Sequence, residues 1–199
     1  MIGTISPVVY EGEKRKMKWL AIFIVYLFCS TLSAGFTGSI IGTLGYYFLP
    51  DASQPFTLFT LGICSITFAL HEIGVFQLRL PCHRWQVPGN WRIRFRPWKF
   101  SVLYGAILGA GLFTYIRSTT FFLAIFVTLL VADPVESAFI FAAYGVAQSL
   151  PPLIAGLKTE SFEDAYQCSV KIHKYRRFAE LSNGLLLTFI GIYFFLSAV

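Results

Sequence analysis

The sequence contains few charged residues. Asp, Glu, Lys and Arg make up 13% of the 199 residues, whereas a soluble domain carries about a quarter. Hydrophobic residues account for 56% of the chain and the mean hydropathy is +0.65. A surface that faces water needs many charged side chains, and this chain has too few to cover one. The composition therefore excludes an ordinary soluble domain and predicts a protein whose surface lies largely in lipid.

Cysteine is also scarce, and its spacing lacks the patterns that bind metal. The sequence has no CxxC motif and no Cys/His spacing suited to zinc. It therefore predicts neither a disulfide framework, nor a metal site, nor a bound cofactor. The four cysteines are Cys29, Cys64, Cys82 and Cys168.

A cleavage site for a signal peptide is missing as well. The polar segment 1–18 ends in basic residues, but the apolar run that follows is longer than a signal-peptide core, and no small-residue motif closes it. We interpret the run as a retained membrane anchor that follows a cytoplasmic N-terminal segment.

Long apolar stretches are abundant. A helix that crosses the membrane needs about 20 apolar residues. The sequence predicts an all-α, polytopic membrane protein with about five transmembrane segments in a single transmembrane domain, 19–199. The segments are 19–49, 56–76, 100–131, 135–157 and 179–199.

Two of these segments are too long for one straight span. At 1.5 Å per residue, 19–49 and 100–131 would each extend about 48 Å, beyond a hydrocarbon core of about 30 Å. We therefore expect broken or strongly tilted helices. Glycine is concentrated in both segments, in positions that suit either close helix packing or a hinge. The candidates are Gly35, Gly38 and Gly42 in the first and Gly105, Gly109 and Gly111 in the second.

Positive charge indicates the orientation. Of the 16 Lys and Arg residues, four precede the first segment, six lie in 79–99 and five in 158–177. The positive-inside rule then places the N-terminus and both loops in the cytoplasm, next to anionic headgroups of the cell inner membrane. Because the charge lies beside apolar runs, we expect lipid rather than nucleic acid as its partner.

The chain also has the pattern of an internal duplication. Lys18 and Lys99 each precede a Gly-rich segment, a short acidic turn and an ordinary span, so the repeat units are 19–76 and 100–157, followed by a final span at 179–199. Matching interrupted segments are typical of transporters with sites near the membrane midplane.

One basic residue lies inside an apolar segment. Arg117 is flanked by the hydroxyl groups of Thr114, Tyr115, Ser118 and Thr119. A charge in the membrane is costly unless it is paired or lines a polar cavity. Arg117 is thus our first candidate for an intramembrane polar site that meets a solute or ion, with snorkelling to the outer interface as the alternative.

Two weaker candidate pairs follow from side-chain chemistry. His71 and Glu72 could form part of a proton relay, or could simply be solvated near the cytoplasmic face. Cys29 and Cys64 have similar expected depths and could form a redox pair, or could act as small apolar residues.

Three stretches resemble a known family. They are "LYGAILGAGLFTYIRSTTFF", "AAYGVAQSLPPLIAGL" and "SAGFTGSIIGTLG". They are similar to the transmembrane domain of the CcdA/DsbD-type cytochrome c biogenesis and thiol-disulfide interchange family, including its MauF-like branch. The resemblance implies broken helices with one redox cysteine at each break. The matching places, Ser39 and Tyr115 or Ile116, have no cysteine, so no catalytic residue can be carried over.

Three functional hypotheses follow. The first is transport or conduction of a small solute or ion, with Arg117 at the broken-helix site. The second is a non-catalytic accessory or structural subunit that binds another membrane protein or a copy of itself. The third is a thiol redox protein. An enzymatic activity is not expected.

Overall fold

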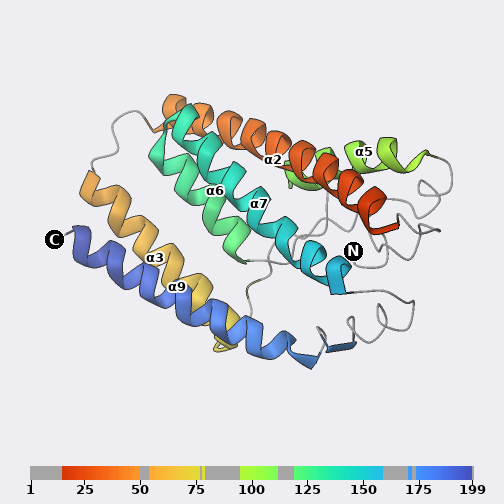
Figure 1. Cartoon of the computed structure of the whole chain (residues 1–199). Coiled ribbons are helices and arrows are strands. Elements are labelled where there is room, and N and C mark those ends of the chain that lie inside the picture. The colour runs from red at the N-terminus through yellow and green to blue at the C-terminus, as the bar shows by residue number, and fades with distance from the viewer. Residues whose placement is uncertain are drawn as a thin grey trace. The chain divides into compact units, whose positions relative to one another are not determined.

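The structure is a computed structural model that describes residues 15–49, 54–76, 78, 95–111, 119–158, 170–171 and 174–198. Figure 1 shows the chain with its helices labelled. All regular elements that the described ranges contribute are helices, which confirms the all-α fold. They are α2 (Arg15–Phe48), α3 (Gln54–Ile73), α5 (Pro97–Ala110), α6 (Thr119–Val131), α7 (Pro134–Lys158) and α9 (Arg176–Ala198).

Four helices are long and apolar enough to cross a membrane. These candidate spans are Lys16–Phe48, Gln54–Ile73, Pro134–Leu157 and Arg177–Ala198, and Thr119–Val131 is a shorter apolar helix. Large apolar side chains also remain exposed along them, such as Phe36 on α2 and Phe189 on α9. Water would disfavour so much exposed apolar surface, whereas lipid accepts it. The chain is a polytopic integral membrane protein in contact with lipid.

The two overlong segments behave differently. Segment 100–131 is broken, as one of the two expectations had it: α5 ends at Ala110 and α6 begins at Thr119. Gly111 ends α5 with a φ of 66°, a left-handed conformation that suits glycine, and its N–H bonds Leu108 O at 3.1 Å. Segment 19–49 instead lies in the unbroken, 34-residue α2. The prediction of a break in the first segment is therefore wrong. The other expectation, a strongly tilted helix, remains for this segment.

The helices fall into two compact units. Unit 1 comprises Met1–Ala34, Arg84–Thr114 and Ala142–Tyr175, and unit 2 comprises Gly35–His83, Tyr115–Phe141 and Arg176–Val199. Helices α2 and α7 are each divided between the two units. The predicted repeat, 19–76 and 100–157, has different boundaries and stays a prediction.

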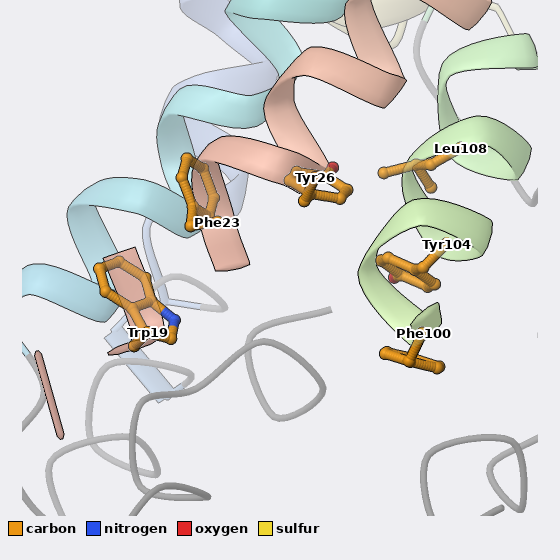
Figure 2. Packing of buried hydrophobic residues seen from close by; sticks show 6 residues of the cluster. All are labelled: Trp19, Phe23, Tyr26, Phe100, Tyr104 and Leu108. Carbon is orange, nitrogen blue, oxygen red and sulfur yellow. The ribbon is translucent and has the colours of Figure 1, made fainter. Parts of the chain in front are cut away.

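Aromatic side chains form the core of unit 1. Trp19, Phe23 and Tyr26 recur at helical spacing on one face of α2, and Phe100 and Tyr104 do so on α5. Figure 2 shows both sets together with Leu108. The two helices meet at Tyr26 and Tyr104, whose ring centroids lie 6.0 Å apart. Aromatic burial thus joins α2 to α5.

Bare backbone brings the same two helices close together further along. A Cβ atom added at Gly105 would lie 2.7 Å from Tyr26 O, and one added at Gly109 would overlap Ser30 O. Beside this seam, the Ser33 hydroxyl donates to Ala106 O at 2.7 Å. Only residues without a side chain permit this approach.

The order of contacts gives the helix directions in unit 1. Tyr26 of α2 contacts Tyr104 of α5, and Ser30, further along α2, contacts Gly109, further along α5. These two helices therefore run parallel. On α7, Gly145 faces Ala34 and Gly156 faces Trp19, so α7 runs antiparallel to α2. The first residues of α2 and α5 and the last residues of α7 therefore lie at one end of the unit.

Helices α3 and α9 form an antiparallel pair in unit 2, side by side in Figure 1. Phe59 packs edge-on against Phe195, with centroids 5.1 Å apart. The buried Ser65 donates its hydroxyl hydrogen to Leu187 O at 2.8 Å. Leu187 also belongs to the apolar core of this unit, with Phe68, Ala69 and Leu123.

The other half of unit 2 depends on glycine packing. A Cβ atom at Gly38 or Gly42 would overlap Ser137 of α7, and one at Gly45 would overlap Leu129 O of α6. Ser137 in turn donates to Thr128 O at 3.1 Å. These glycines of α2 serve close packing, which explains why the helix continues through them.

Candidate functional site

A polar cluster joins three helices within unit 2. It consists of Glu72 in the last turn of α3, Thr119 and Thr120 at the start of α6, and Asn183 in the second turn of α9. Thr119 is completely buried, and the other three side chains are half-buried. Polar side chains at such positions in a membrane protein need partners, and here they partner one another.

The Glu72 carboxylate is the centre of the cluster. Its Oε1 accepts a hydrogen bond from the Thr119 hydroxyl at 2.5 Å and one from Asn183 Nδ2 at 3.3 Å. Asn183 Nδ2 also lies 3.4 Å from Thr119 Oγ1, and Asn183 Oδ1 accepts from the Thr120 hydroxyl at 3.0 Å. The Thr119 hydroxyl and the Asn183 amide both act as donors to Glu72, and the carboxylate oxygen accepts both hydrogen bonds.

The ends of two helices influence this carboxylate. Glu72 lies at the C-terminus of α3, where the helix dipole disfavours negative charge. Thr119 is the first residue of α6, whose N-terminal end favours negative charge. The hydrogen bond between the two residues therefore couples the beginning of α6 to the end of α3.

Glycine and arginine position α9 against α3. A Cβ atom at Gly184 would lie 2.9 Å from Ile73 Cγ1 and 3.3 Å from Glu72 Cβ, so glycine there lets Asn183 reach the carboxylate. Arg177 Nη2 donates to Ile73 O at 2.8 Å. This bond satisfies a carbonyl left free at the end of α3. Arg177 also pairs with Glu180 at 3.6 Å, an exposed contact of little energetic weight.

The cluster suits holding helices together. Hydroxyl and amide groups bind the carboxylate from two other helices, and the charge is stabilised by charge-assisted hydrogen bonds. Each group in the network has a partner, so all four side chains constrain one another's positions. These four residues hold α3, α6 and α9 together around one carboxylate, and we refer to them as the lock.

The sequence-predicted polar site coincides with this cluster at one residue. Thr119 is part of the network. Arg117, Thr114, Tyr115 and Ser118 lie outside the described residues. A role for Arg117 in meeting a solute or ion therefore stays a prediction.

The structure gives His71 and Glu72 separate partners. His71 Nδ1 accepts a hydrogen bond from the Leu78 amide at 3.0 Å and lies 3.2 Å from Phe76 O, whereas Glu72 faces Thr119. Adjacent helical residues point about 100° apart, which separates their environments. Among the described contacts no hydrogen bond joins the two side chains, and their proton relay stays a prediction.

The two candidate redox cysteines lie in different units. Cys29 is on α2 in unit 1 and Cys64 is on α3 in unit 2, and both are free thiols that are half-buried. The pairing stays a prediction. Cys64 packs against the apolar core of unit 2.

The predicted glycines occupy three kinds of position. Gly38, Gly42, Gly105 and Gly109 lie where another helix comes too close for a side chain. Gly111 ends α5. Gly35 lies half-buried inside the unbroken α2.

Sequence reasoning missed Asn183. The residue was read as part of an ordinary final span, although an amide inside an apolar segment is itself a signal of a buried polar contact. Its position directly before Gly184, in "ELSNGLLL", was a second signal. Arg177 was assigned only to the basic loop.

The relatives found among curated proteins are named methylamine utilization protein MauF. The chain is 24% identical over 190 residues to the protein from Paracoccus versutus, which covers 95% of this chain and 68% of the relative. It is 23% identical over 181 residues to the one from Paracoccus denitrificans, covering 91% and 64%. For Methylophilus methylotrophus the values are 25% over 134 residues, covering 67% and 47%. The chain thus spans about half to two thirds of its relatives' length.

These relatives correct the family resemblance. No family model matches the chain, and no solved structure matches it. The assignment to the CcdA/DsbD-type thiol-disulfide interchange family is wrong, because the similarity leads to MauF proteins, which are unrelated to that family. The Gly-rich stretches that suggested it are features of close helix packing, which unrelated membrane proteins share. Neither transport nor cytochrome c biogenesis finds support in these relatives.

Proposed function

We propose that this chain is a non-catalytic accessory protein of the cell inner membrane that acts in methylamine utilization by binding a protein partner. The observation that carries the proposal is the similarity to MauF proteins along 95% of the chain. The relatives' name supplies the process, and the chain's membrane helices supply the setting.

The chemistry of the polar cluster supports an accessory role. Its hydroxyl and amide groups are committed to one another and to Glu72. Such a network stabilises one arrangement of α3, α6 and α9, which is what a partner protein would recognise. A rigid surface lowers the entropic cost of binding.

A growth experiment tests the process. Deleting the chain in its own host should abolish growth on methylamine as the nitrogen source while leaving growth on ammonium unchanged, and re-expression should restore it. Unchanged growth on methylamine after deletion would remove the link to that process.

A purification experiment tests the accessory role. The tagged chain, isolated from membranes of cells grown on methylamine in a mild detergent, should bring down one protein in a fixed ratio. The Thr119→Val and Thr67→Val variants provide a matched pair, because Thr119 belongs to the lock whereas Thr67 bonds only Ile63 O in its own helix. We expect loss of the partner only with Thr119→Val. Recovery of the chain without any stoichiometric protein would contradict the accessory role.

We propose that the N-terminus lies in the cytoplasm. The start of α2, the start of α5 and the end of α7 share one end of unit 1, and each adjoins a basic segment of the sequence. The positive-inside rule assigns that end to the cytoplasm. Single cysteines replacing Ser53, Asn90 or Thr159 report the orientation: an impermeant thiol reagent added to intact cells should label only position 53. Labelling at position 90 from outside would reverse the orientation.

A further inference from the structure

The parts of α2, α5 and α7 that belong to unit 1 carry only positive charge, and they carry it at one end. Segments 15–34, 95–111 and 142–158 contain six Lys and Arg residues and no Asp or Glu. The six lie at the start of α2, at the start of α5 and at the end of α7, which share one end of the unit. We call this the basic end, and it attracts anions. Its residues are Arg15, Lys16, Lys18, Arg96, Lys99 and Lys158.

Three basic side chains at this end are open to a ligand. Lys18, Arg96 and Lys99 are exposed, and none of them forms an ion pair within the part of the chain that the structure describes. The Lys99 ammonium lies 5.5 Å from the ring centroid of Trp98, which is 52% exposed. Tryptophan is enriched at the level of the lipid headgroups. The basic side chains therefore lie where the phosphates of a bilayer are found.

Exposed apolar side chains continue from the basic residues along the same helix faces. Val25 lies seven residues after Lys18, and Leu103 lies four residues after Lys99, spacings that repeat on one face of a helix. Both apolar side chains are 36% exposed. A ligand that matches this surface has an anionic head and long apolar chains. An anionic phospholipid has both, whereas a nucleotide or an acidic peptide lacks the apolar chains.

The length of α5 gives such a lipid a structural role. The 14 residues of this helix extend about 21 Å, less than the hydrocarbon core of about 30 Å. Its apolar length therefore does not fix its depth in the bilayer, as it does for a full span. Gly105 and Gly109 hold one side of α5 against α2. A headgroup bound at Arg96 and Lys99 holds the start of α5 at the membrane surface.

We propose that the basic end of unit 1 binds an anionic phospholipid, whose phosphate contacts Lys18, Arg96 and Lys99. Its acyl chains lie along Val25 and Leu103. Each Lys or Arg near an anionic headgroup adds electrostatic attraction, and no acidic side chain of these three helix segments opposes it. The inference concerns a lipid ligand and does not depend on the proposed function.

Lipid retention tests the selectivity and the residues. The full chain in a mild detergent, mixed with equal amounts of phosphatidylglycerol and phosphatidylcholine, should retain phosphatidylglycerol in native mass spectrometry. Lys99→Gln should bind phosphatidylglycerol about fivefold more weakly, and Lys18→Gln/Lys99→Gln about twentyfold, because positive charge is lost. Arg177→Gln is the matched control and should bind like the parent, since Arg177 already pairs with Glu180 in unit 2. Equal retention of the two lipids, or equal affinity of the parent and the double variant, would refute the site.

Competition with inorganic phosphate separates a lipid site from a site for any anion. Millimolar phosphate should leave phosphatidylglycerol bound, because the free anion lacks acyl chains that contact the apolar side chains. Displacement of the lipid by phosphate would overturn the proposal in favour of a simple anion site. Circular dichroism with thermal unfolding checks that the Gln variants fold, which is expected because the replaced side chains are exposed.

Photo-cross-linking locates the lipid. In liposomes of equal phosphatidylglycerol and phosphatidylcholine, a photoreactive residue in place of Leu103 should form adducts enriched in phosphatidylglycerol. The same residue in place of the exposed Leu44, about 39 Å along α2 from Lys18, should form adducts of both lipids equally. The enrichment at position 103 should disappear in Lys18→Gln/Lys99→Gln. The same lipid ratio at positions 103 and 44, or an enrichment that survives the double variant, would refute the proposal.

Discussion

In unit 1 the helices meet through aromatic rings and bare backbone, whereas in unit 2 three helices are also joined by hydrogen bonds around a carboxylate. In unit 1 the Tyr26 ring packs against the Tyr104 ring in a tilted arrangement, and Gly109 lies against Ser30. Glu72, Thr119 and Asn183 bond one another in the second. Without a hydrophobic force between helices in lipid, packing and interhelical hydrogen bonds are the available means of association. The two units use these means in different proportions.

The difference teaches where each unit is vulnerable. A seam of bare backbone has no room for added atoms, so unit 1 should fail when a side chain is enlarged. The glycine-packed half of unit 2 shares this sensitivity. The polar network of α3, α6 and α9 depends instead on its hydrogen-bond donors, so this part of unit 2 should be destabilised when a donor is removed. The following substitutions test this contrast.

The largest effect is expected at the seam of unit 1. Gly109→Leu places a side chain where the Ser30 backbone lies and should destabilise the fold by about 3 kcal/mol through overpacking. Ala21→Leu on the exposed face of α2 adds the same atoms and should change stability little. Thermal unfolding in detergent measures both. If both variants unfold at the temperature of the parent, the seam does not hold unit 1 together.

An intermediate effect is expected at the lock of unit 2. Thr119→Val keeps the side-chain shape but removes the donor to Glu72, and should cost about 1.5 kcal/mol. Thr67→Val, whose hydroxyl bonds Ile63 O in its own helix, should cost much less. A double-mutant cycle of Thr119→Val with Glu72→Gln isolates the coupling. Additive effects would mean that this hydrogen bond contributes nothing to unit 2.

The smallest effects should be alike in both units. Ser33 donates to Ala106 O in unit 1 and Ser65 donates to Leu187 O in unit 2, at 2.7 and 2.8 Å. Ser33→Ala and Ser65→Ala each remove one crossing hydrogen bond, so each should cost about 0.6 kcal/mol. Equal losses of stability in thermal unfolding would show that the units differ in their main contacts and not in the stability that a single interhelical hydrogen bond contributes. A loss confined to one variant would break that equivalence.

Much of the architecture could be predicted from local composition. Apolar length marks α3, α7 and α9, because a span needs about 20 apolar residues whatever its neighbours are. The break in 100–131 was also foreseeable, since the segment overshoots the bilayer and carries Gly111. The continuity of α2 was not, because its glycines could break a helix or pack it. The backbones of Ser137 and Leu129 decide for packing.

The candidate site was only partly visible in the sequence. Glu72 and Thr119 stood out as polar groups inside or beside apolar segments. Their pairing did not, because side chains 47 residues apart meet only when α3 and α6 pack antiparallel. His71 and Glu72 have separate hydrogen-bond partners, since neighbouring residues on a helix point in different directions, and their proton relay stays a prediction.

The sequence by itself determined that this is a helical integral membrane protein and where its longest apolar segments lie. These properties depend only on the hydrophobicity and length of contiguous residues. Only the tertiary structure decided which glycines pack and which amide meets Glu72. Asn183 is a polar side chain in an apolar helix. It meets a carboxylate 111 residues away, a contact set by how the helices pack and not by the residues beside it.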